Sequence, residues 1–384
     1  MQHFYFDHNA TTPVAPEVLE TMVSCLGQVY GNASSIHHFG QAAKQKLEAA
    51  RRQVAALIHA SPAEVVFTSG GTEADNLALF GMVRAAGRPQ AHIIVSSIEH
   101  PAVLASAAQL EREGVAVTCL PVSANGTVDP EGVRRAIRPG TVLVSIMHAN
   151  NELGVVQPIA EISRVTSEAG VPLHVDGVQA LGKIPVDVDT LGVDLYSMSG
   201  HKLYAPKGVG ALYMRKGTKL APTAFGGHHE RDRRPGTENV PGIVAFGAAC
   251  ELAGRTLAAE SERLAALRDR LENSVLGRIS GVGVSGRYAT RTPNTSNIYF
   301  DGVDGEAMVI ALDLRGFAVS TGSACSSGAI TPSHVLTALG LSADRARSSL
   351  RFSLGRATTA EQVDALVDAL EASVAHLRRI SVHA

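Results

Sequence analysis

The chain has 384 residues, enough for two or three domains of about 150 residues each. Its 34 Lys and Arg residues nearly balance its 36 Asp and Glu residues, and neither sign gathers in blocks, so nucleic acid and anionic membranes are not expected partners. Hydrophobic residues make up 45% and charged residues 18%, which excludes a disordered chain and predicts a packed core.

No unbroken apolar run reaches the about 20 residues of a membrane-spanning helix, and residues 1–9 lack the basic start and apolar middle of a signal peptide. We therefore expect a cytoplasmic protein. The four cysteines have no paired metal spacing, so we expect reduced thiols and no metal site. Cys25, Cys119 and Cys250 lie in helical or strand patterns, and we interpret them as small core residues.

Between residues 64 and 215, short β-branched runs alternate with longer helical patterns, which is typical of a parallel sheet covered by helices. The runs expected to form strands are 65–67, 93–95, 115–117, 142–146, 173–175 and 195–196. Residues 73–86 and 159–169 are predicted helices. We assign this region to a large domain that spans residues 10–255.

A long helical pattern begins near Pro241 and continues to Leu276, and we expect it to bridge to a second unit. The elements expected in that unit are strands at 296–300 and 350–354, a helix at 306–315 and a last helix with apolar residues on one face from Val363 to Leu377. The last helix is predicted to open with a capping box between Thr358 and Glu361. We assign residues 1–9 and 256–384 to a smaller α/β domain.

Two familiar motifs fail when their surroundings are considered. Residues 281–286 have the spacing of a dinucleotide-binding fingerprint, but a segment ending at Pro293 follows where that motif requires a helix. Residues 199–202 match the Ser-x-x-Lys of penicillin-recognising hydrolases, but no Ser-Asp-Asn or Lys-Thr-Gly accompanies them. We therefore discount both activities.

A glycine turn at residues 68–73 leads from a predicted strand into a predicted helix. Unpaired backbone N–H groups and the helix dipole at such a point suit a phosphate, and Thr72 would add a hydroxyl. A plain helix cap explains the same residues, so both interpretations stay open for this segment alone.

Asp176 and Lys202 each follow a predicted strand, at the sheet edge where α/β proteins bind ligands. A partly buried Asp176 needs a donor or cation, which could be a protonated pyridine nitrogen, an arginine or a backbone N–H. Most lysines are simply solvated, but a desolvated Lys202 could form an imine. A phosphate cradle, an acid and a recessed lysine are together what an aldehyde-bearing pyridine phosphate needs, so we favour the joint interpretation.

Ten segments in chain order carry a wider resemblance. They are DHNATTP (7–13), GNASSIH (31–37), SGGTE (69–73), IEHP (98–101), NNELG (150–154), HVD (174–176), SGHK (199–202), RPGTEN (234–239), GSACS (322–326) and LRFSLGR (350–356). Together they resemble the group I cysteine desulfurases of the class V aminotransferase family. The resemblance implies an α/β fold like that of aspartate aminotransferase, with a large, mixed, mostly parallel sheet domain and a smaller α/β domain. It also implies a homodimer with pyridoxal 5'-phosphate as cofactor.

The resemblance also implies a role for each matching residue. Lys202 would hold the cofactor as a Schiff base, and His100 would stack on its ring. Asp176 would pair with the pyridine nitrogen and Gln179 with the ring hydroxyl. The residues implied for the phosphate are Thr72, Ser199, His201 and, from the other subunit, Thr237, and those implied for the substrate carboxylate are Asn151 and Arg351.

The implied activity is that of a cysteine desulfurase, a sulfurtransferase that converts L-cysteine to L-alanine. Lys202 would act as base, and Cys325 would take the sulfur as a persulfide and pass it to an acceptor or an iron–sulfur scaffold protein, for cluster assembly or thiolation. Because a free thiol has a pKa of about 8.5, a proton acceptor such as His100 or the substrate is expected nearby. Small residues around Cys325 suit a mobile loop, although a cysteine in a simple turn fits them too.

Several alternatives share parts of this pattern. A related aminotransferase, a selenocysteine lyase or another β-lyase would use the same cofactor residues, and only Cys325 and its neighbours indicate persulfide chemistry. A scaffold that delivers sulfur without catalysis would not need Lys202 and Asp176 at strand ends. Housekeeping members of the family use a C-terminal extension to meet their scaffold, whereas this chain ends at Ala384 soon after its last helix, so the acceptor stays open.

Overall fold

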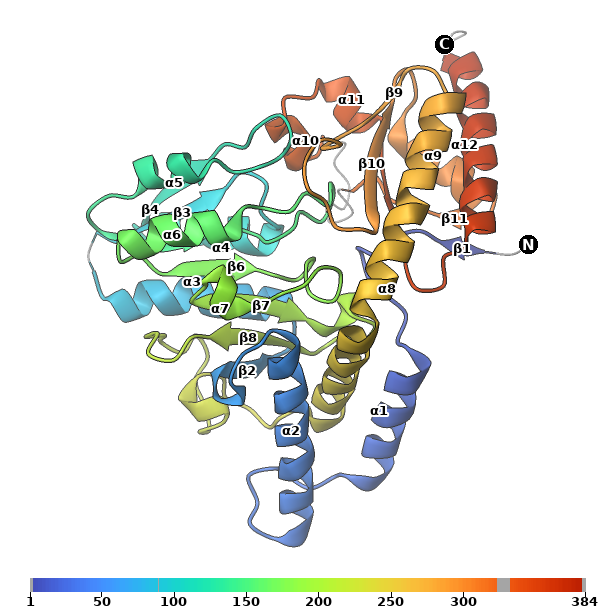
Figure 1. Cartoon of the computed structure of the whole chain (residues 1–384). Coiled ribbons are helices and arrows are strands. Elements are labelled where there is room, and N and C mark those ends of the chain that lie inside the picture. Colours follow the sequence, from blue (N-terminus) through green and yellow to red (C-terminus); the bar gives the residue numbers. More distant parts are fainter. Residues whose placement is uncertain (1–2, 89, 323–331, 382–384) are drawn as a thin grey trace.

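The computed structural model describes residues 3–88, 90–322 and 332–381. Its main sheet has seven strands in the order β2-β8-β7-β6-β5-β3-β4 (Figure 1). The strands are β2 Val65–Thr68, β3 His92–Ser96, β4 Ala116–Leu120, β5 Thr141–Ser145, β6 Leu173–Asp176, β7 Leu195–Ser199 and β8 Gly210–Met214. All neighbours are parallel except β8, which runs antiparallel to both β2 and β7. The mixed, mostly parallel sheet expected from the sequence is therefore confirmed.

The six runs that were expected to form strands all do so, and the sequence missed only β8 in this sheet. That strand begins with Gly210 and Ala211, which have little intrinsic preference for extended structure. Its place between β2 and β7 comes from pairing with both neighbours. A strand of this kind is decided by its partners, so its own sequence gives a weak signal.

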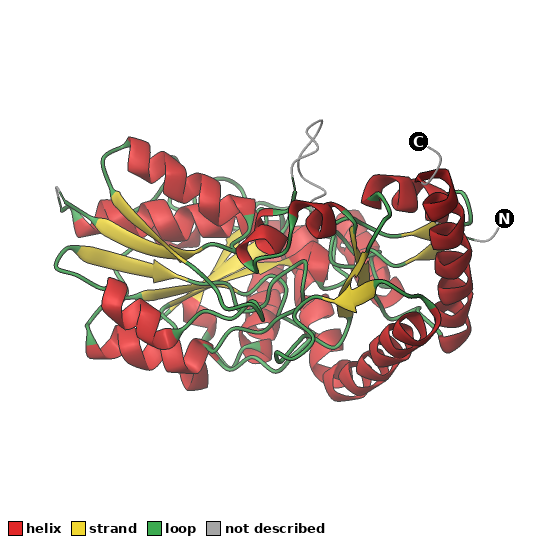
Figure 2. Cartoon of the chain, turned by 90° about the horizontal axis from the view of Figure 1, so that it is seen from above, coloured by secondary structure: helices red, strands yellow, loops and turns green. Residues whose placement is uncertain are grey.

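Helices cover both faces of the sheet, as Figure 2 shows. They include α3 Gly71–Ala86, α4 Pro101–Arg112, α5 Pro130–Ala136, α6 Ile159–Glu168 and α7 Val188–Leu191. Alternate residues of one strand enter different cores: Ile93 and Val95 pack in one cluster, whereas Ile94 packs with Val144 in the other. Burial on both faces explains why the parallel strands are continuous apolar runs.

Helix α8, Val240–Arg278, passes from the large sheet region to the C-terminal region, against α1 Pro16–Gln28 and α2 His38–Leu57. Its first half enters the core of the large region through residues such as Phe246, and its second half enters another core through Leu264 and Leu271. Among the described residues, α8 is the one helix long and apolar enough to cross a membrane by composition. Half of that stretch is buried, so this is weak evidence for a span.

The C-terminal region contains β1 Phe4–Tyr5, β9 Val282–Val284, β10 Thr295–Phe300, β11 Phe317–Ala318, β12 Ser349–Ser353, α9 Gly305–Asp313, α10 His334–Ala338, α11 Ala343–Arg347 and α12 Ala360–Ser381. Helices α9 and α12 and the strands build its core with the second half of α8, whereas α10 and α11 pack in a separate cluster with residues such as Met147. Strands β12, β10 and β9 form an antiparallel sheet, and β1 pairs with β11. Phe6 packs in this core with α12 residues such as Leu366. We therefore propose the domain division into residues 10–255 and residues 1–9 plus 256–384, because each part has a core of its own.

Two local predictions were wrong. The capping box of α12 joins Thr359 and Gln362, whose side chains each accept the other's backbone N–H at 3.3 Å, whereas the Thr358 hydroxyl accepts the N–H of Gly355. Cys119 is exposed because it lies on β4, the edge strand of the sheet. Cys25 and Cys250 are buried as expected, and all three thiols are free.

Candidate active site

The N-terminal end of α3 meets the C-terminal ends of β6 and β7. A Cβ placed on Gly71 would lie 2.7 Å from Cγ2 of Val178 and 3.5 Å from Cβ of Ser199, so this glycine permits a close approach. No side chain caps α3 at Gly70, which leaves backbone N–H groups of its first turn for another partner. With the hydroxyls of Thr72 and Ser199 beside them, these donors fit a phosphate.

Glu73 connects this glycine turn to the segment that carries Thr237. Its carboxylate accepts the N–H of Ser69 at 2.7 Å and Nε of Arg234 at 2.8 Å. Burial opposes ionisation of Glu73, but the hydrogen bonds from Arg234 and Ser69 lower its pKa. Thr237 itself is exposed on the chain that enters α8. A role of Thr237 in the site of a second subunit therefore stays a prediction.

Asp176, at the end of β6, is 5% exposed and accepts the N–H of Val178 at 2.9 Å. Burial raises its pKa, and nearby His100 and Lys202 partly offset this effect. A cation at the remaining carboxylate oxygen would stabilise the ionised form. The donor set at Asp176 therefore fits a protonated ring nitrogen.

Two further buried acids surround Asp176, and the sequence reasoning gave neither a role. Burial raises the pKa of Asp75 on α3 well above its usual range, and the charge of Asp176 adds to this effect. Burial also raises the pKa of Glu99 to about 8, although Ser96 and the N–H of Met147 donate to its carboxylate. The higher pKa of each acid favours its neutral form. Asp176 is left as the carboxylate best placed to carry charge.

His100 caps α4, and its Nδ1 accepts the N–H of Ala102 at 3.1 Å. Burial lowers the pKa of this ring, so the neutral form is favoured, and the hydrogen bond assigns its proton to Nε2. Nε2 is thus a donor in this arrangement. His100 could accept a proton only at Nδ1, and only after its hydrogen bond with the N–H of Ala102 is broken.

Lys202 closes a 3₁₀ turn, Gly200–Lys202, that directly follows β7. Its Nζ donates to the carbonyl oxygens of Asn9 and Ala10, both at 2.6 Å. The N-terminal segment thus crosses the end of β7, which the sequence could not show. The amine is therefore held at the end of β7, on the same sheet edge as Asp176.

Gln179 and His201 also contact the N-terminal segment. Nε2 of Gln179 donates to the carbonyl of Asn9 at 3.0 Å, and Nδ1 of His201 lies 3.1 Å from the Thr11 hydroxyl. Burial and the charge of Lys202 lower the pKa of His201 to about 4, so its ring is neutral near pH 7. A neutral imidazole can donate one hydrogen bond to a phosphate.

Arg351 lies on β12 with its side chain opposite those of Leu350 and Phe352, which enter the core. Its Nη2 donates to Asp7 at 2.6 Å and its Nη1 donates to the carbonyl oxygen of Asn151 at 3.2 Å, while Nε is buried without a partner. This group is therefore held in place and keeps donor capacity for a carboxylate. The sequence reasoning missed Asp7 as its partner, although Asp7 begins the first of the ten motif segments.

Cys325 lies outside the described residues. The residues on either side of residues 323–331 can be placed: the Ser333 hydroxyl donates to Glu152 at 2.6 Å, and a Cβ on Gly322 would lie 2.9 Å from the same carboxylate. Burial raises the pKa of Glu152. Glu152 follows Asn151, so both ends of the segment that contains Cys325 approach the site.

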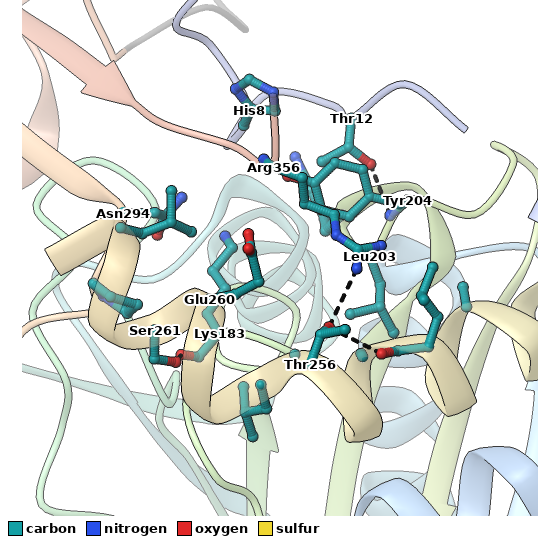
Figure 3. Close-up of a pocket in the computed structure, with 18 of the residues that line it drawn as sticks. His8, Thr12, Lys183, Leu203, Tyr204, Thr256, Glu260, Ser261, Asn294 and Arg356 are labelled. Atoms are coloured by element: carbon teal, nitrogen blue, oxygen red, sulfur yellow. Dashed lines mark hydrogen bonds between the residues drawn. The ribbon is translucent and has the colours of Figure 1, made fainter. Parts of the chain in front are cut away.

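A cavity of about 50 Å³ is lined by Lys202 and by residues of the N-terminal segment and α8 (Figure 3). Polar residues that line it include His8, Lys183, Tyr204 and Glu260. The space suffices for water molecules but not for an amino acid. Within the described part of the chain, no three His, Cys, Asp or Glu side chains are grouped so as to hold a metal ion.

Comparison with known proteins shows the family of the chain. Residues 4–366 match the aminotransferase class-V family. The chain is 48% identical over 377 residues to a protein named cysteine desulfurase IscS from Dictyoglomus turgidum, covering 98% of this chain and 96% of the relative. It is 49% identical over 380 residues to a protein of the same name from Anaeromyxobacter sp., with 98% and 94% covered.

Solved structures give the same picture. A NifS-like protein superposes with a TM-score of 0.92 at 36% identity, covering 98% of this chain and all of that one. A structure described as SspA in complex with cysteine superposes with a TM-score of 0.81 at 37% identity, covering 91% and 98%. The likeness extends over nearly the whole chain and shows the fold.

Proposed function

Because the chain belongs to the class V aminotransferase family, and within it to the cysteine desulfurases, we propose that it converts L-cysteine to L-alanine and holds the released sulfur on Cys325. The observation that supports this function most directly is the convergence of three features at one sheet edge. They are the uncapped end of α3, buried Asp176, and Lys202 at the end of β7.

The residues present fit pyridoxal 5'-phosphate. When bound, this cofactor would be linked to Lys202 and would accept the electrons released at the substrate Cα. The phosphate would be held by the end of α3 with Thr72, Ser199 and His201. Asp176 would hold the ring nitrogen, Gln179 the ring hydroxyl, and His100 the face of the ring. Burial raises the pKa of Asp75 and Glu99 and favours their neutral forms, so a cationic ring nitrogen would pair with Asp176.

The remaining steps belong to side chains of this chain. Arg351 and Asn151 would hold the substrate carboxylate, and the amine of Lys202, once displaced by the substrate amine, would take the Cα proton. The Cys325 thiolate would then attack the substrate sulfur. An S–S bond forms, the C–S bond breaks, and its electron pair stays with the carbon fragment that becomes alanine. Since Nε2 of His100 is a donor, the substrate is the better acceptor for the thiol proton.

Product analysis tests this function. Protein loaded with the cofactor and given L-cysteine and a thiol reductant should release alanine and sulfide in equal amounts. A keto acid in place of alanine would instead identify an aminotransferase or a β-lyase that eliminates sulfide. If neither alanine nor a keto acid is formed, the protein has only a non-catalytic role.

Replacing Arg351 with glutamine should raise KM for L-cysteine by roughly 10- to 100-fold with a smaller effect on kcat, because one charge-assisted hydrogen bond to the carboxylate is lost. The Asp7→Asn/Arg351→Gln double variant is the matched control, since the single change leaves Asp7 without its cation. If the double variant regains the wild-type KM, the effect came from unpaired Asp7 and not from substrate binding.

We further propose a homodimer in which α1 and the start of α2 meet a second copy of this chain. The exposed apolar residues in this region are Leu19, Val23 and Leu26 on α1, followed by Tyr30, Ile36 and Phe39. The spacing of Leu19, Val23 and Leu26 places them on one face of α1. Exposing such an apolar face to water is unfavourable, so it is suited to an interface. The partner's copy of the exposed Thr237 would then reach this site.

The Leu26→Asp variant should dissociate the dimer, because the new carboxylate would be buried in the interface. Light scattering after gel filtration measures the mass, and cofactor affinity should fall with it, since Thr237 would be withdrawn. The change Glu111→Ala on the exposed end of α4 is a control that should keep the mass of a dimer. A monomeric wild-type protein with full activity would contradict the proposal.

As its partner we propose a sulfur-acceptor protein or an iron–sulfur scaffold, and as its location the cytoplasm. The three described cysteines are free, which suits a reducing compartment. The nearly balanced charge gives no support for nucleic acid or membrane binding. Capture by persulfide-loaded protein would identify the acceptor.

A further inference from the structure

Asn9 occupies the centre of the site and binds residues from both cores. Its carbonyl oxygen accepts Nζ of Lys202 and Nε2 of Gln179. Its side-chain Nδ2 donates to the carbonyl of Asn151 at 3.1 Å and to the Thr295 hydroxyl at 2.8 Å. Because Asn9 is only 2% exposed, these bonds form without competition from water.

Lys183 also belongs to this hydrogen-bond network around Asn9. No step of the proposed reaction uses it. Its Nζ donates to Oδ1 of Asn9 at 3.0 Å and also to Oε1 of Gln179. Figure 3 shows Lys183 among the residues that line the cavity behind the site. The amine thus lies between this cavity and the two site residues Asn9 and Gln179.

The backbone at Lys183 is fixed on several sides. Gly182 has a φ of +71°, and a Cβ there would lie 1.9 Å from Cδ1 of Leu203, the residue after Lys202. The carbonyl of Lys183 accepts the Ser261 hydroxyl of α8 at 2.8 Å. The amine therefore starts from a rigid point beside the lysine that would hold the cofactor.

The contacts of Gln179 determine which way its amide points. One edge faces the carbonyl oxygen of Asn9, which can only accept, and the other faces the amine of Lys183, which donates. Only one orientation satisfies both, with nitrogen toward Asn9 and oxygen toward Lys183. The second N–H of the amide has no assigned acceptor among these contacts. It is the group that a ring oxygen of the cofactor would require.

We propose that Lys183 is a positioning residue of the cofactor site: it holds the amide oxygen of Gln179, so that the second N–H of Gln179 is presented to the ring oxygen of pyridoxal phosphate. This inference rests on the proposed function, because it needs that cofactor. Lys183 acts through Gln179 and touches neither cofactor nor substrate.

The charged and titratable groups around Lys183 favour its neutral amine, which still has two N–H groups, one for Oδ1 of Asn9 and one for Oε1 of Gln179. Burial and the charges of Lys202 and Arg351 lower the pKa of Lys183 well below its usual range. Burial lowers the pKa of His8 and of His201 to about 4, and the charge of Lys183 makes a smaller contribution to both shifts. Glu260 and Arg356 line the same cavity, and Glu260 is paired with Arg263 at 2.9 Å. No carboxylate is paired with Lys183 in the described structure.

The test is a pH titration of the visible absorbance of protein loaded with the cofactor, in the wild type, Lys183→Met, Gln179→Met and the double variant. A ring oxygen that loses its N–H donor is more basic and holds the shared proton of the Lys202 linkage more tightly. The midpoint for Lys183→Met should therefore move upward by roughly half to one pH unit. Gln179→Met should show a shift of the same sign, and the double variant should match Gln179→Met alone.

Lys216→Met, which changes an exposed lysine after β8, is the matched control and should titrate like the wild type. If Lys183→Met does not fold, Lys183→Gln in the same two backgrounds provides the comparison. An unshifted midpoint in a coloured Lys183 variant would overturn the inference. Additive shifts in the double variant would also overturn it, because they would mean that Lys183 acts on the Lys202 linkage directly and not through Gln179. A colourless wild-type protein would overturn the proposed function as well, so the two failures are distinguishable.

Discussion

The Lys202→Ala variant is expected to remain folded, to bind no cofactor covalently and to lose at least roughly a thousand-fold of its turnover, because one amine serves as both tether and base. Its Nζ donates to two backbone carbonyls, of Asn9 and Ala10. The loss of these bonds should lower stability by only about 1 to 2 kcal/mol. The functional loss is therefore not explained by unfolding.

Borohydride reduction followed by peptide mass spectrometry measures this directly. Wild-type protein should carry the reduced cofactor on the peptide that contains Lys202, and the variant should carry none. Lys207→Ala is a close control, because Lys207 is exposed and only five positions away. Turnover by Lys202→Ala at the wild-type rate would remove Lys202 from the reaction.

The Cys325→Ser variant is expected to keep the yellow colour but to release almost no sulfide, with a loss of at least roughly a hundred-fold, because a hydroxyl is a far poorer nucleophile toward sulfur than a thiolate. The phosphate cradle, Asp176 and Lys202 are untouched by this change. Colour therefore separates this variant from Lys202→Ala. The added sulfur atom should be found on the peptide of Cys325 in the wild type.

Cys119→Ser is the matched control for Cys325→Ser, because Cys119 is the exposed thiol of the described residues. Its position on edge strand β4 keeps it outside the set of site residues. This control should retain both colour and sulfide release. If Cys119→Ser and Cys325→Ser lost activity equally, a general thiol effect would replace the persulfide mechanism.

Local patterns in the sequence predicted much of the fold. The apolar runs correctly predicted six strands of the large sheet, because parallel strands that are buried on both faces consist of consecutive hydrophobic residues. Period-two alternation also placed Arg351 opposite Leu350 and Phe352. The capping box was shifted by one residue, since neighbouring Thr358 and Thr359 give nearly the same local signal.

The sequence by itself therefore determined the fold class, the family and a set of chemically sensible residues, including Lys202 and Asp176. Only the tertiary structure decided how these residues are held, through Asp7 on Arg351 and through Asn9 and Lys183 around Gln179. The reason is distance along the chain: Asn9 and Gln179 are 170 positions apart, and Asp7 and Arg351 are 344 apart. Periodicity and caps report contacts within a few residues, whereas the partners of a buried polar group are set by which elements pack together.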